Sequence, residues 1–293
     1  MVTHTSWLFL TDATLRRRQL LEVDWLALLL SAICHDLEHP GTTNAYQVNT
    51  GSALALRYND ASVLENHHCC VGFAAMERNG ILKCLDAATL KALRKLFVAA
   101  VLATDMSVHK DLLARVGARA TAEAAPSAAG GGPAPPAPSG NGAVGKPGVG
   151  DAPPCGFSRD SPEDRQLLVS FLLHCADLCN PLLPPPVSRR IANELSMEFS
   201  RQAELERAAS LPVTVMLAHD DVGKAKLELG FLEYVVAPLY KTLSTISPVL
   251  GNRCLALIEE NRAAWSEIIA SDTDADHSSR HSNGADPPPA ARR

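Results

Sequence analysis

The sequence contains no apolar segment long enough to cross a lipid bilayer. Its longest apolar run, Trp25 to Cys34, has about half of the ~20 residues that a membrane-spanning helix needs. The first residues show no basic region followed by an apolar stretch and no small-residue cleavage site, so we expect no secretory signal. These absences predict a cytoplasmic protein without a membrane span.

Clustered positive charge is also missing. The net charge is −5, and the one basic cluster, Arg16-Arg17-Arg18, is typical of a solvated helix face. The composition therefore gives no electrostatic reason to expect nucleic acid or an anionic membrane as a partner. The eight cysteines include no C-x-x-C pair, which indicates reduced and mostly buried thiols.

Alternating apolar and polar residues, the pattern of half-buried strands, are absent as well. The chain instead carries apolar residues at helical spacing, and it is long enough, with 46% hydrophobic residues, to bury one large core. We therefore predict an all-α domain. Three stripes predict helices with one buried face: Leu93, Leu96, Phe97, Ala100, Val101 and Thr104; Leu167, Phe171, Cys175 and Leu178; and Leu227, Phe231, Tyr234, Val235 and Leu239.

Two stretches are too poor in large apolar side chains to join that core. Residues 117–160 are dominated by Ala, Gly and Pro, and residues 271–293 are polar and end in the sequence PPPAARR. Neither can bury enough surface to offset the entropy lost on ordering, so we predict that both are disordered. The domain would then consist of residues 1–116 and 161–270, interrupted by an insertion.

The densest group of chemically active side chains is segment 35–41, with the sequence HDLEHPG. His35 and His39 are four residues apart, which would place them on one helix face. One interpretation is a zinc-protease helix of the H-E-x-x-H type, but an aspartate stands where that motif has its glutamate base. We favour a pair formed by His35 and Asp36 with both side chains on metal and the carboxylate free to bridge two ions. A capping pair without metal is the third interpretation.

A second polar group lies in segment 58–68. Asp60 is a candidate cap for a helix beginning near Ala61, and that helix would carry Glu65 and His68 on neighbouring faces. Burying such groups in an otherwise apolar helix is costly without partners. Metal-bound waters would supply those partners.

Two more segments complete the pattern. Segment 103–107 ends the central helix with two polar groups, and in segment 174–181 Asp177 interrupts an apolar helix. Each segment alone is a weak signal, because a buried polar residue is usually just hydrogen-bonded. Taken together, the four segments predict a metal site in an all-α protein.

These four segments, in this order, resemble those of the class I 3',5'-cyclic nucleotide phosphodiesterases. The similarity covers residues 2–116 and 162–270, and the sequence looks most like the branch that prefers cyclic GMP. The resemblance implies a multi-helix bundle of the HD type. It also implies hydrolysis of cyclic GMP, cyclic AMP or both to 5'-monophosphates in signal transduction, and it allows a homodimer.

The resemblance further implies two divalent metal ions, zinc and either magnesium or manganese. In the family, the two cations activate a water as hydroxide, which attacks phosphorus in line while the 3' oxygen leaves. In the family, four ligands hold the first ion, and three of them match His35, Asp36 and Asp177. The ligand that matches Asp36 also bridges to the second ion. The shell that holds the waters of the second ion matches His39, Glu65 and Thr104.

A purine pocket is implied too. Phe231 matches the aromatic residue that stacks on the base, Leu195 the aliphatic residue on its other face, and Asn180 a residue lining the site. From the residues alone, Phe231 and Leu195 would be ordinary core. Glu228 stands where the family has a purine-binding glutamine. An ionised carboxylate only accepts hydrogen bonds, so Glu228 could pair with the N1–H and 2-amino groups of guanine, unless it points to solvent and pairs with Lys224.

The family's H-N-x-x-H motif, which supplies the general acid and one zinc ligand, would lie upstream of Val2. His4 matches a position after that motif. Losing a general acid typically costs ~10²–10⁴-fold in rate, so we expect the chain as given to have low activity. Two other interpretations stay open: a catalytically inactive pseudoenzyme that binds nucleotide or a regulatory partner, and a different His-Asp metal phosphohydrolase, which would leave the Phe231 pocket unexplained.

Overall fold

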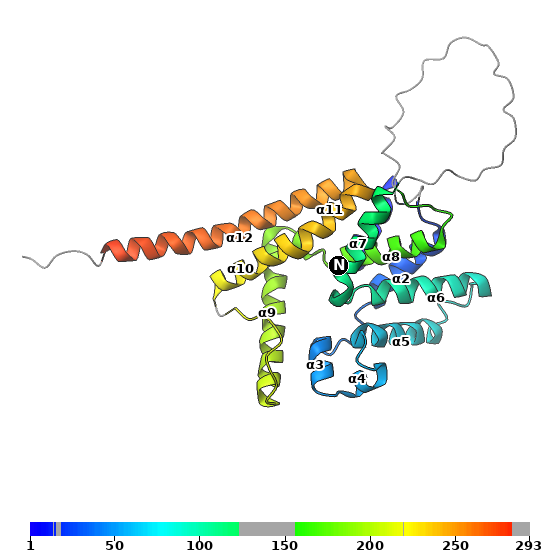
Figure 1. The fold of residues 1–293 in the computed structure, drawn as a ribbon, viewed down its shortest axis with the longest axis horizontal. Coiled ribbons are helices and arrows are strands. Elements are labelled where there is room, and N and C mark those ends of the chain that lie inside the picture. Colours follow the sequence, from blue (N-terminus) through cyan, green and yellow to red (C-terminus); the bar gives the residue numbers. More distant parts are fainter. Residues whose placement is uncertain (14, 16–18, 123–155, 219, 283–293) are drawn as a thin grey trace, which may run out of the picture.

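The computed structural model describes residues 1–122 and 156–282, except residues 14, 16–18 and 219. Within these ranges every regular element is helical, which confirms the predicted all-α fold (Figure 1). Residues 123–155, which make up most of the predicted insertion, lie outside the described residues, as do 283–293 and the arginine cluster. No helix in the described ranges combines the length and the hydropathy of a bilayer-spanning segment.

The helices pack in two groups, joined by α7 (His109–Thr121), which contacts both. The first group, centred on α2, contains α1 (Val2–Thr11), α2 (Glu22–Cys34), α3 (Asn44–Asn49), α4 (Ala53–Tyr58), α5 (Val63–Arg78), α6 (Ala87–Leu102) and α8 (Pro162–Asp177). In the second group, α12 packs along α10 and α11 and touches α9 (Figure 1). Its members are α9 (Pro185–Ala208), α10 (Asp221–Phe231), α11 (Ala237–Ile246) and α12 (Pro248–Ser282).

One apolar core contains residues from before and after 123–155. Helix α8 runs through its centre, because every residue from Leu168 to Ala176 is buried. The stripe predicted on α6 is confirmed from Leu93 to Val101, whereas Thr104 lies beyond the end of that helix. Asp177 is the last residue of α8, at the point where the helix leaves the core, so its carboxylate lies at the edge of the core.

The edges of the predicted insertion are ordered and contact each other. Helix α7 continues to Thr121, so the boundary predicted after residue 116 falls inside a helix. After the gap, Phe157 is buried and Asp164 accepts two hydrogen bonds of 2.7 Å from Arg119. The backbone N–H of Gly156 also donates to the carbonyl of Ala120 at 3.3 Å. Disorder between residues 123 and 155 stays a prediction.

The C-terminal boundary was predicted too early. Helix α12 continues past Ser271 to Ser282, so residues 271–282 are helical and not the disordered tail we expected. This segment contains neither Gly nor Pro, the residues that most often end a helix. A polar composition alone was therefore a poor signal for the end of the helix.

The third predicted stripe is only partly correct. Leu239 is buried, but Tyr234 is 73% exposed. A π-helical turn over Leu232–Val236 widens the helix at this point and rotates the face that follows it. Leu232 and Val236 are buried instead.

Candidate metal centre and base pocket

Segment 35–41 forms a turn. Helix α2 ends at Cys34, and the backbone N–H groups of Leu37 and His39 donate to Cys34 and Asp36 in short-range turns. Glu38 has a φ of 59°, and His39, which precedes Pro40, disfavours the α conformation. The helix therefore cannot continue. The prediction that His35 and His39 share one helix face is therefore wrong.

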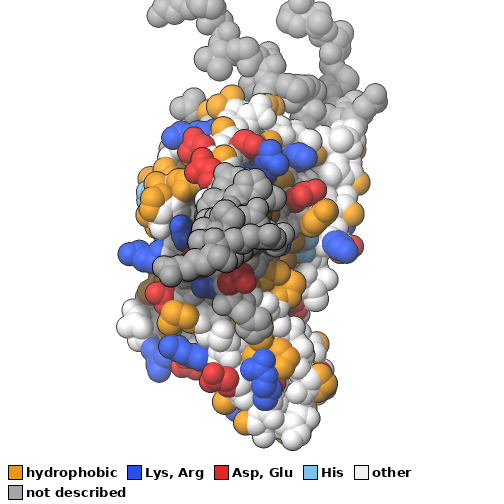
Figure 2. All heavy atoms as spheres, turned by 90° about the vertical axis from the view of Figure 1, so that its left-hand side faces the viewer, with side chains coloured by type: hydrophobic (Ala, Val, Ile, Leu, Met, Phe, Trp, Pro, Cys, Tyr) orange, Lys and Arg blue, Asp and Glu red, His pale blue; other side chains and the backbone are white. Residues whose placement is uncertain are grey.

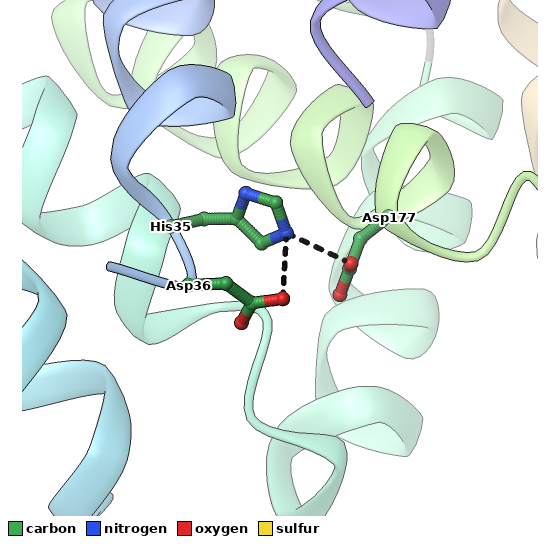
Figure 3. Close-up of side chains that lie close together, drawn as sticks. All are labelled: His35, Asp36 and Asp177. Carbon is green, nitrogen blue, oxygen red and sulfur yellow. Dashed lines mark ion pairs between the residues drawn. The ribbon is translucent and has the colours of Figure 1, made fainter. Parts of the chain in front are cut away.

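The turn brings two carboxylates to one imidazole nitrogen. His35 Nε2 lies 3.3 Å from Asp36 Oδ2 and 3.2 Å from Asp177 Oδ1, although Asp177 comes from the distant helix α8 (Figure 3). The other ring nitrogen, Nδ1, donates to the carbonyl of Ala32 at 3.1 Å. That hydrogen bond places the proton of a neutral imidazole on Nδ1 and leaves Nε2 as a free ligand atom, the arrangement usual for metal-binding histidines.

The electrostatics of this cluster favour a cation. Burial disfavours the charged imidazolium, yet the two neighbouring carboxylates outweigh burial and raise the pKa of His35 to about 10. The ligand atoms of His35, Asp36 and Asp177 all lie within 4.8 Å of one another. One imidazole and two carboxylates are a donor set that suits zinc, manganese or magnesium, so the residues fit a divalent ion.

Helix α5 supplies the next layer of polar groups. It begins at Val63 after Ser62, which has a φ of 40°, and Asp60 does not cap it, contrary to our expectation. Glu65 is buried and accepts hydrogen bonds of 2.9 and 3.2 Å from the amide of Asn44. Burial raises the pKa of the Glu65 carboxyl, and this amide only partly opposes the effect.

His68, which the sequence marked as a costly buried polar group without assigning it a role in the site, lies beside Asp36. Its Nε2 is 3.9 Å from Asp36 Oδ1, and its Nδ1 donates to the carbonyl of Leu37 at 2.7 Å. It also stacks on the ring of His39, with 5.8 Å between the centroids. The spacing of Glu65 and His68, three residues apart on one helix, is the sequence signal that links His68 to this site.

The side chains of the other two predicted shell residues form their hydrogen bonds with nearby backbone groups. His39 is exposed, and its Nδ1 accepts a hydrogen bond from the backbone N–H of Gly41 at 3.1 Å. Thr104 lies in the turn after α6, and its hydroxyl donates to the carbonyl of Val101 at 2.8 Å. Within the described part of the chain, neither side chain forms a hydrogen bond or ion pair with the cluster.

The four predicted substrate-binding residues line one cavity of about 340 Å³. Asn180 comes three residues after Asp177, so the cavity adjoins the metal cluster along the chain, although none of the three cluster residues lines it. Its Oδ1 atom is buried and has no hydrogen-bond partner among the described residues. Leu195, on α9, is 42% exposed and belongs to the cavity wall rather than to the core.

Glu228 lies in this cavity on the same helix as Phe231. Within the described residues its carboxylate has no hydrogen bond or ion pair, and burial raises the pKa of the carboxyl. Lys224 also lines the cavity, but its ammonium pairs with Asp221 at 3.7 Å. The alternative in which Glu228 pairs with Lys224 is therefore wrong.

The outer face of the second helix group carries mixed charge. Figure 2 views the molecule from the left-hand side of Figure 1 and shows Lys and Arg side chains interspersed with Asp and Glu and separated by apolar residues. No broad basic area is visible among the described residues on this face. The view agrees with the net charge of −5.

Comparison with known proteins decides the family. Residues 1–255 match the 3'5'-cyclic nucleotide phosphodiesterase family. The chain belongs to this family. It is the family that the four sequence segments were found to resemble, and membership implies the use of divalent metal ions.

Individual phosphodiesterases show how far the similarity extends. The chain is 32% identical over 250 residues to mouse 3',5'-cyclic-AMP phosphodiesterase 4C, covering 85% of this chain and 33% of that protein. It is 28% identical over 249 residues to mouse high affinity cGMP-specific 3',5'-cyclic phosphodiesterase 9A, covering 84% and 40%. The chain thus spans a third to two-fifths of these relatives.

A solved phosphodiesterase domain has the same fold. The crystal structure of the phosphodiesterase domain of Salpingoeca rosetta rhodopsin phosphodiesterase superimposes with a TM-score of 0.79 at 32% identity. The superposition covers 94% of this chain and 75% of that one.

Proposed function

We propose that this chain is the catalytic part of an enzyme that hydrolyses 3',5'-cyclic nucleotides to 5'-monophosphates in signal transduction. The observation that carries the proposal is the convergence of His35, Asp36 and Asp177 beside an apolar cavity. The relatives named for cyclic AMP and for cyclic GMP support this substrate class. A cytoplasmic location and a homodimer remain predictions.

The three residues of the metal cluster would share one ion, and Asp36 would also serve a second. Nε2 of His35 and the carboxylates of Asp36 and Asp177 would hold the first ion, zinc, since they point at one place. The side chain of Asp36 is 64% exposed, so Asp36 would also be accessible to a magnesium or manganese ion. When bound, the two ions would supply Lewis-acid activation of water and neutralise charge on the phosphate.

The surrounding residues orient these groups. His68 lies beside Asp36 and would limit the rotation of its carboxylate. Glu65, His39 and Thr104 would accept or donate hydrogen bonds to waters of the second ion. Glu65 is suited to this task because it is buried and already oriented by Asn44.

The cavity would hold the purine. Phe231 would stack on one face of the base and Leu195 on the other, while the unpaired Oδ1 of Asn180 would accept a hydrogen bond from the nucleotide. An aromatic residue that stacks on a base contributes ~1–3 kcal/mol. The cavity thus accounts for nucleotide binding separately from the ions.

Glu228 would select guanine. Its carboxylate has no protein partner in the described structure and can accept hydrogen bonds from the N1–H and 2-amino groups of guanine, whereas N1 of adenine is itself an acceptor. Glu228→Gln should reduce the ratio of cyclic GMP to cyclic AMP affinity by about tenfold, the worth of one charge-assisted hydrogen bond. The measurement is calorimetric titration of both nucleotides, with Glu233→Gln on the same helical segment as the control. An unchanged ratio would contradict this assignment.

The metal centre can be tested by ion binding as well as by turnover. Asp177→Asn should weaken Mn²⁺ or Zn²⁺ binding by at least ~100-fold, because removing a ligand costs more than removing an orienting group. Asp111→Asn is the matched control, since Asp111 is 70% exposed and its ion-pair partner among the described residues is Arg115 at 3.5 Å. Equal ion affinity in the two variants would refute the metal centre.

An assay of product formation with the same variants separates an enzyme from a pseudoenzyme. Hydrolysis of cyclic nucleotide that Asp177→Asn abolishes and Asp111→Asn preserves would establish the enzyme. Binding of ion and nucleotide with no product, in a form of the protein extended at its N-terminus, would favour the pseudoenzyme.

A further inference from the structure

Helix α9 carries two fully buried polar side chains, Gln202 and Glu206, on a helix that is otherwise mostly exposed. Each is only 1% exposed, and they lie four residues apart on one face. Burying an amide and a carboxylate is costly unless both are fully hydrogen-bonded. Their partners therefore identify what this part of α9 holds in place.

On one side, Gln202 reaches the metal end of the molecule. Its Oε1 accepts a hydrogen bond of 2.8 Å from the backbone N–H of Thr43, and its Nε2 donates to the Thr43 hydroxyl at 3.1 Å. Thr43 caps α3, and the next residue, Asn44, donates to Glu65 and accepts from the backbone of Leu64. An unbroken series of hydrogen bonds and one peptide link thus connects α9 to Glu65.

On the other side, Glu206 holds the segment that follows α9. One of its oxygens accepts a 3.0 Å hydrogen bond from the backbone N–H of Thr214, and the other accepts from the Thr214 hydroxyl. Nε2 of Gln202 also donates to Glu206 at 3.0 Å and to the Thr214 hydroxyl at 3.1 Å. Burial opposes ionisation, but these donors outweigh it and lower the pKa of Glu206.

The segment held by Glu206 forms part of the pocket. Two and four residues after Thr214, Met216 and Ala218 line the cavity that also contains Glu228 and Phe231. Apart from these hydrogen bonds the segment is weakly anchored, since Met216 is 70% exposed and Val213 is 39% exposed. The position of this wall therefore depends on Glu206.

We propose that Thr43, Gln202, Glu206 and Thr214 form a latch that couples the Glu65 side of the metal centre to the wall of the base pocket. The latch rests on the proposed function, in which an ion and a purine occupy those two places. Gln202 is its central member, because the same amide group bonds to residues on both sides. Its residues are positioning residues, since none of them contacts the cavity or the metal cluster directly.

The coupling can be measured with probes that do not touch each other. Mn²⁺ and 9-methylguanine or 9-methyladenine are suitable, because these bases carry no phosphate or ribose that could reach an ion. In the full chain, saturating Mn²⁺ should raise base affinity by about fivefold, at the lower end of measured couplings between sites. Calorimetric titration with and without Mn²⁺, well below the unfolding temperature, gives the coupling directly.

Two variants should remove this coupling. Glu206→Gln directs an amide NH₂ group at the donors of Thr214 and Gln202, which would release the pocket wall. Base affinity should therefore fall about tenfold, and the effect of Mn²⁺ on it should disappear. Thr214→Val removes a single hydroxyl from an exposed position and should have the same effect on coupling with little loss of stability. Glu204→Gln, on the exposed face of the same helix, is the matched control and should behave as wild type.

The outcomes separate the latch from the function on which it rests. Wild-type base affinity and undiminished coupling in both variants would refute the latch alone. A weaker base affinity with coupling intact would also refute it, because the two residues would then only support the pocket wall. If wild type and Glu204→Gln bind neither Mn²⁺ nor base, the proposed function fails and the latch fails with it.

Discussion

At the metal end of the site, polar groups are surrounded by partners that the protein itself provides. Asn44 and Ala32 bond to Glu65 and His35, and Leu37 bonds to His68. At the pocket end, Asn180 Oδ1 and the Glu228 carboxylate face a mostly apolar wall without partners in the described structure. The two ends adjoin each other but are built on opposite principles.

The difference indicates when each end acquires its shape. A network of satisfied hydrogen bonds fixes side-chain positions before any ligand arrives, whereas unpaired acceptors in a cavity gain their partners only from a ligand. We therefore expect substitutions at the metal end to affect stability, and substitutions in the pocket to affect ligand affinity.

The largest expected contrast concerns two large apolar side chains. Phe97, fully buried in α6, packs edge-on against Phe73, with 4.9 Å between the ring centroids. Phe97→Ala should therefore lower the free energy of unfolding by about 3–5 kcal/mol. Leu195→Ala in the pocket wall should cost less than ~1 kcal/mol, because Leu195 is already 42% exposed. Urea unfolding of both variants makes the comparison. Equal losses of unfolding free energy would mean that Leu195 in the pocket wall belongs to the core as much as Phe97 in the first helix group does.

A somewhat smaller effect is expected from pH. His174 is fully buried with its Nε2 2.8 Å from His109 Nδ1, and burial, together with His109, lowers its pKa to about 4. Between pH 6.5 and 4 the unfolded chain binds a proton at this residue that the folded chain does not, so stability is full above 6.5 and falls with pH by up to about 3 kcal/mol.

His174→Gln isolates this contribution. The variant removes the titrating group, so its unfolding free energy should depend less on pH in this window than that of wild type, whatever its value at pH 8. Chemical denaturation at several pH values measures the slope. Parallel slopes for the two proteins would mean that His174 is not the group responsible.

The smallest expected effect is confined to the pocket. Phe231→Ala should weaken nucleotide binding by about 1–3 kcal/mol. It should lower the free energy of unfolding by less than Phe97→Ala does, because Phe231 packs against the core but is only partly buried. Tyr234→Ala is the control, because Tyr234 lies on the same helical segment and is 73% exposed. A variant of Phe231 that loses stability but keeps its affinity would show that this ring is core.

The same contrast explains how much the sequence could predict. The motif around His35 and the helix ending at Asp177 each carry their residues within a few positions, so local spacing pointed to a metal site, whereas the assignment of His35, Asp36 and Asp177 as ligands came from the family resemblance. The geometry of the turn was not predictable from spacing, because the left-handed Glu38 before His39 and Pro40 stops α2 earlier than a regular helix pattern suggests.

Prediction of the pocket depended on resemblance rather than spacing. Phe231 belongs to a predicted stripe that looks like ordinary core, and Leu195 belongs to none of the predicted stripes. The π-helical turn after Phe231 also shifts the register in a way that no hydrophobic pattern records. Gln202 and Glu206 were missed for a related reason. Polar residues four apart on a helix usually face solvent, and only the tertiary fold buries these two.

The hydrogen bond between Gly156 and Ala120 has a practical consequence for engineering. Because Ala120 and Gly156 are hydrogen-bonded to each other, the two ends of the connection already lie side by side. The entropic cost of closing such a connection grows only slowly with its length. Segment 123–155 could therefore be exchanged for a shorter linker, or for a fluorescent reporter whose own termini are close together. Neither exchange need move α7 or α8, which Arg119 and Asp164 already hold together.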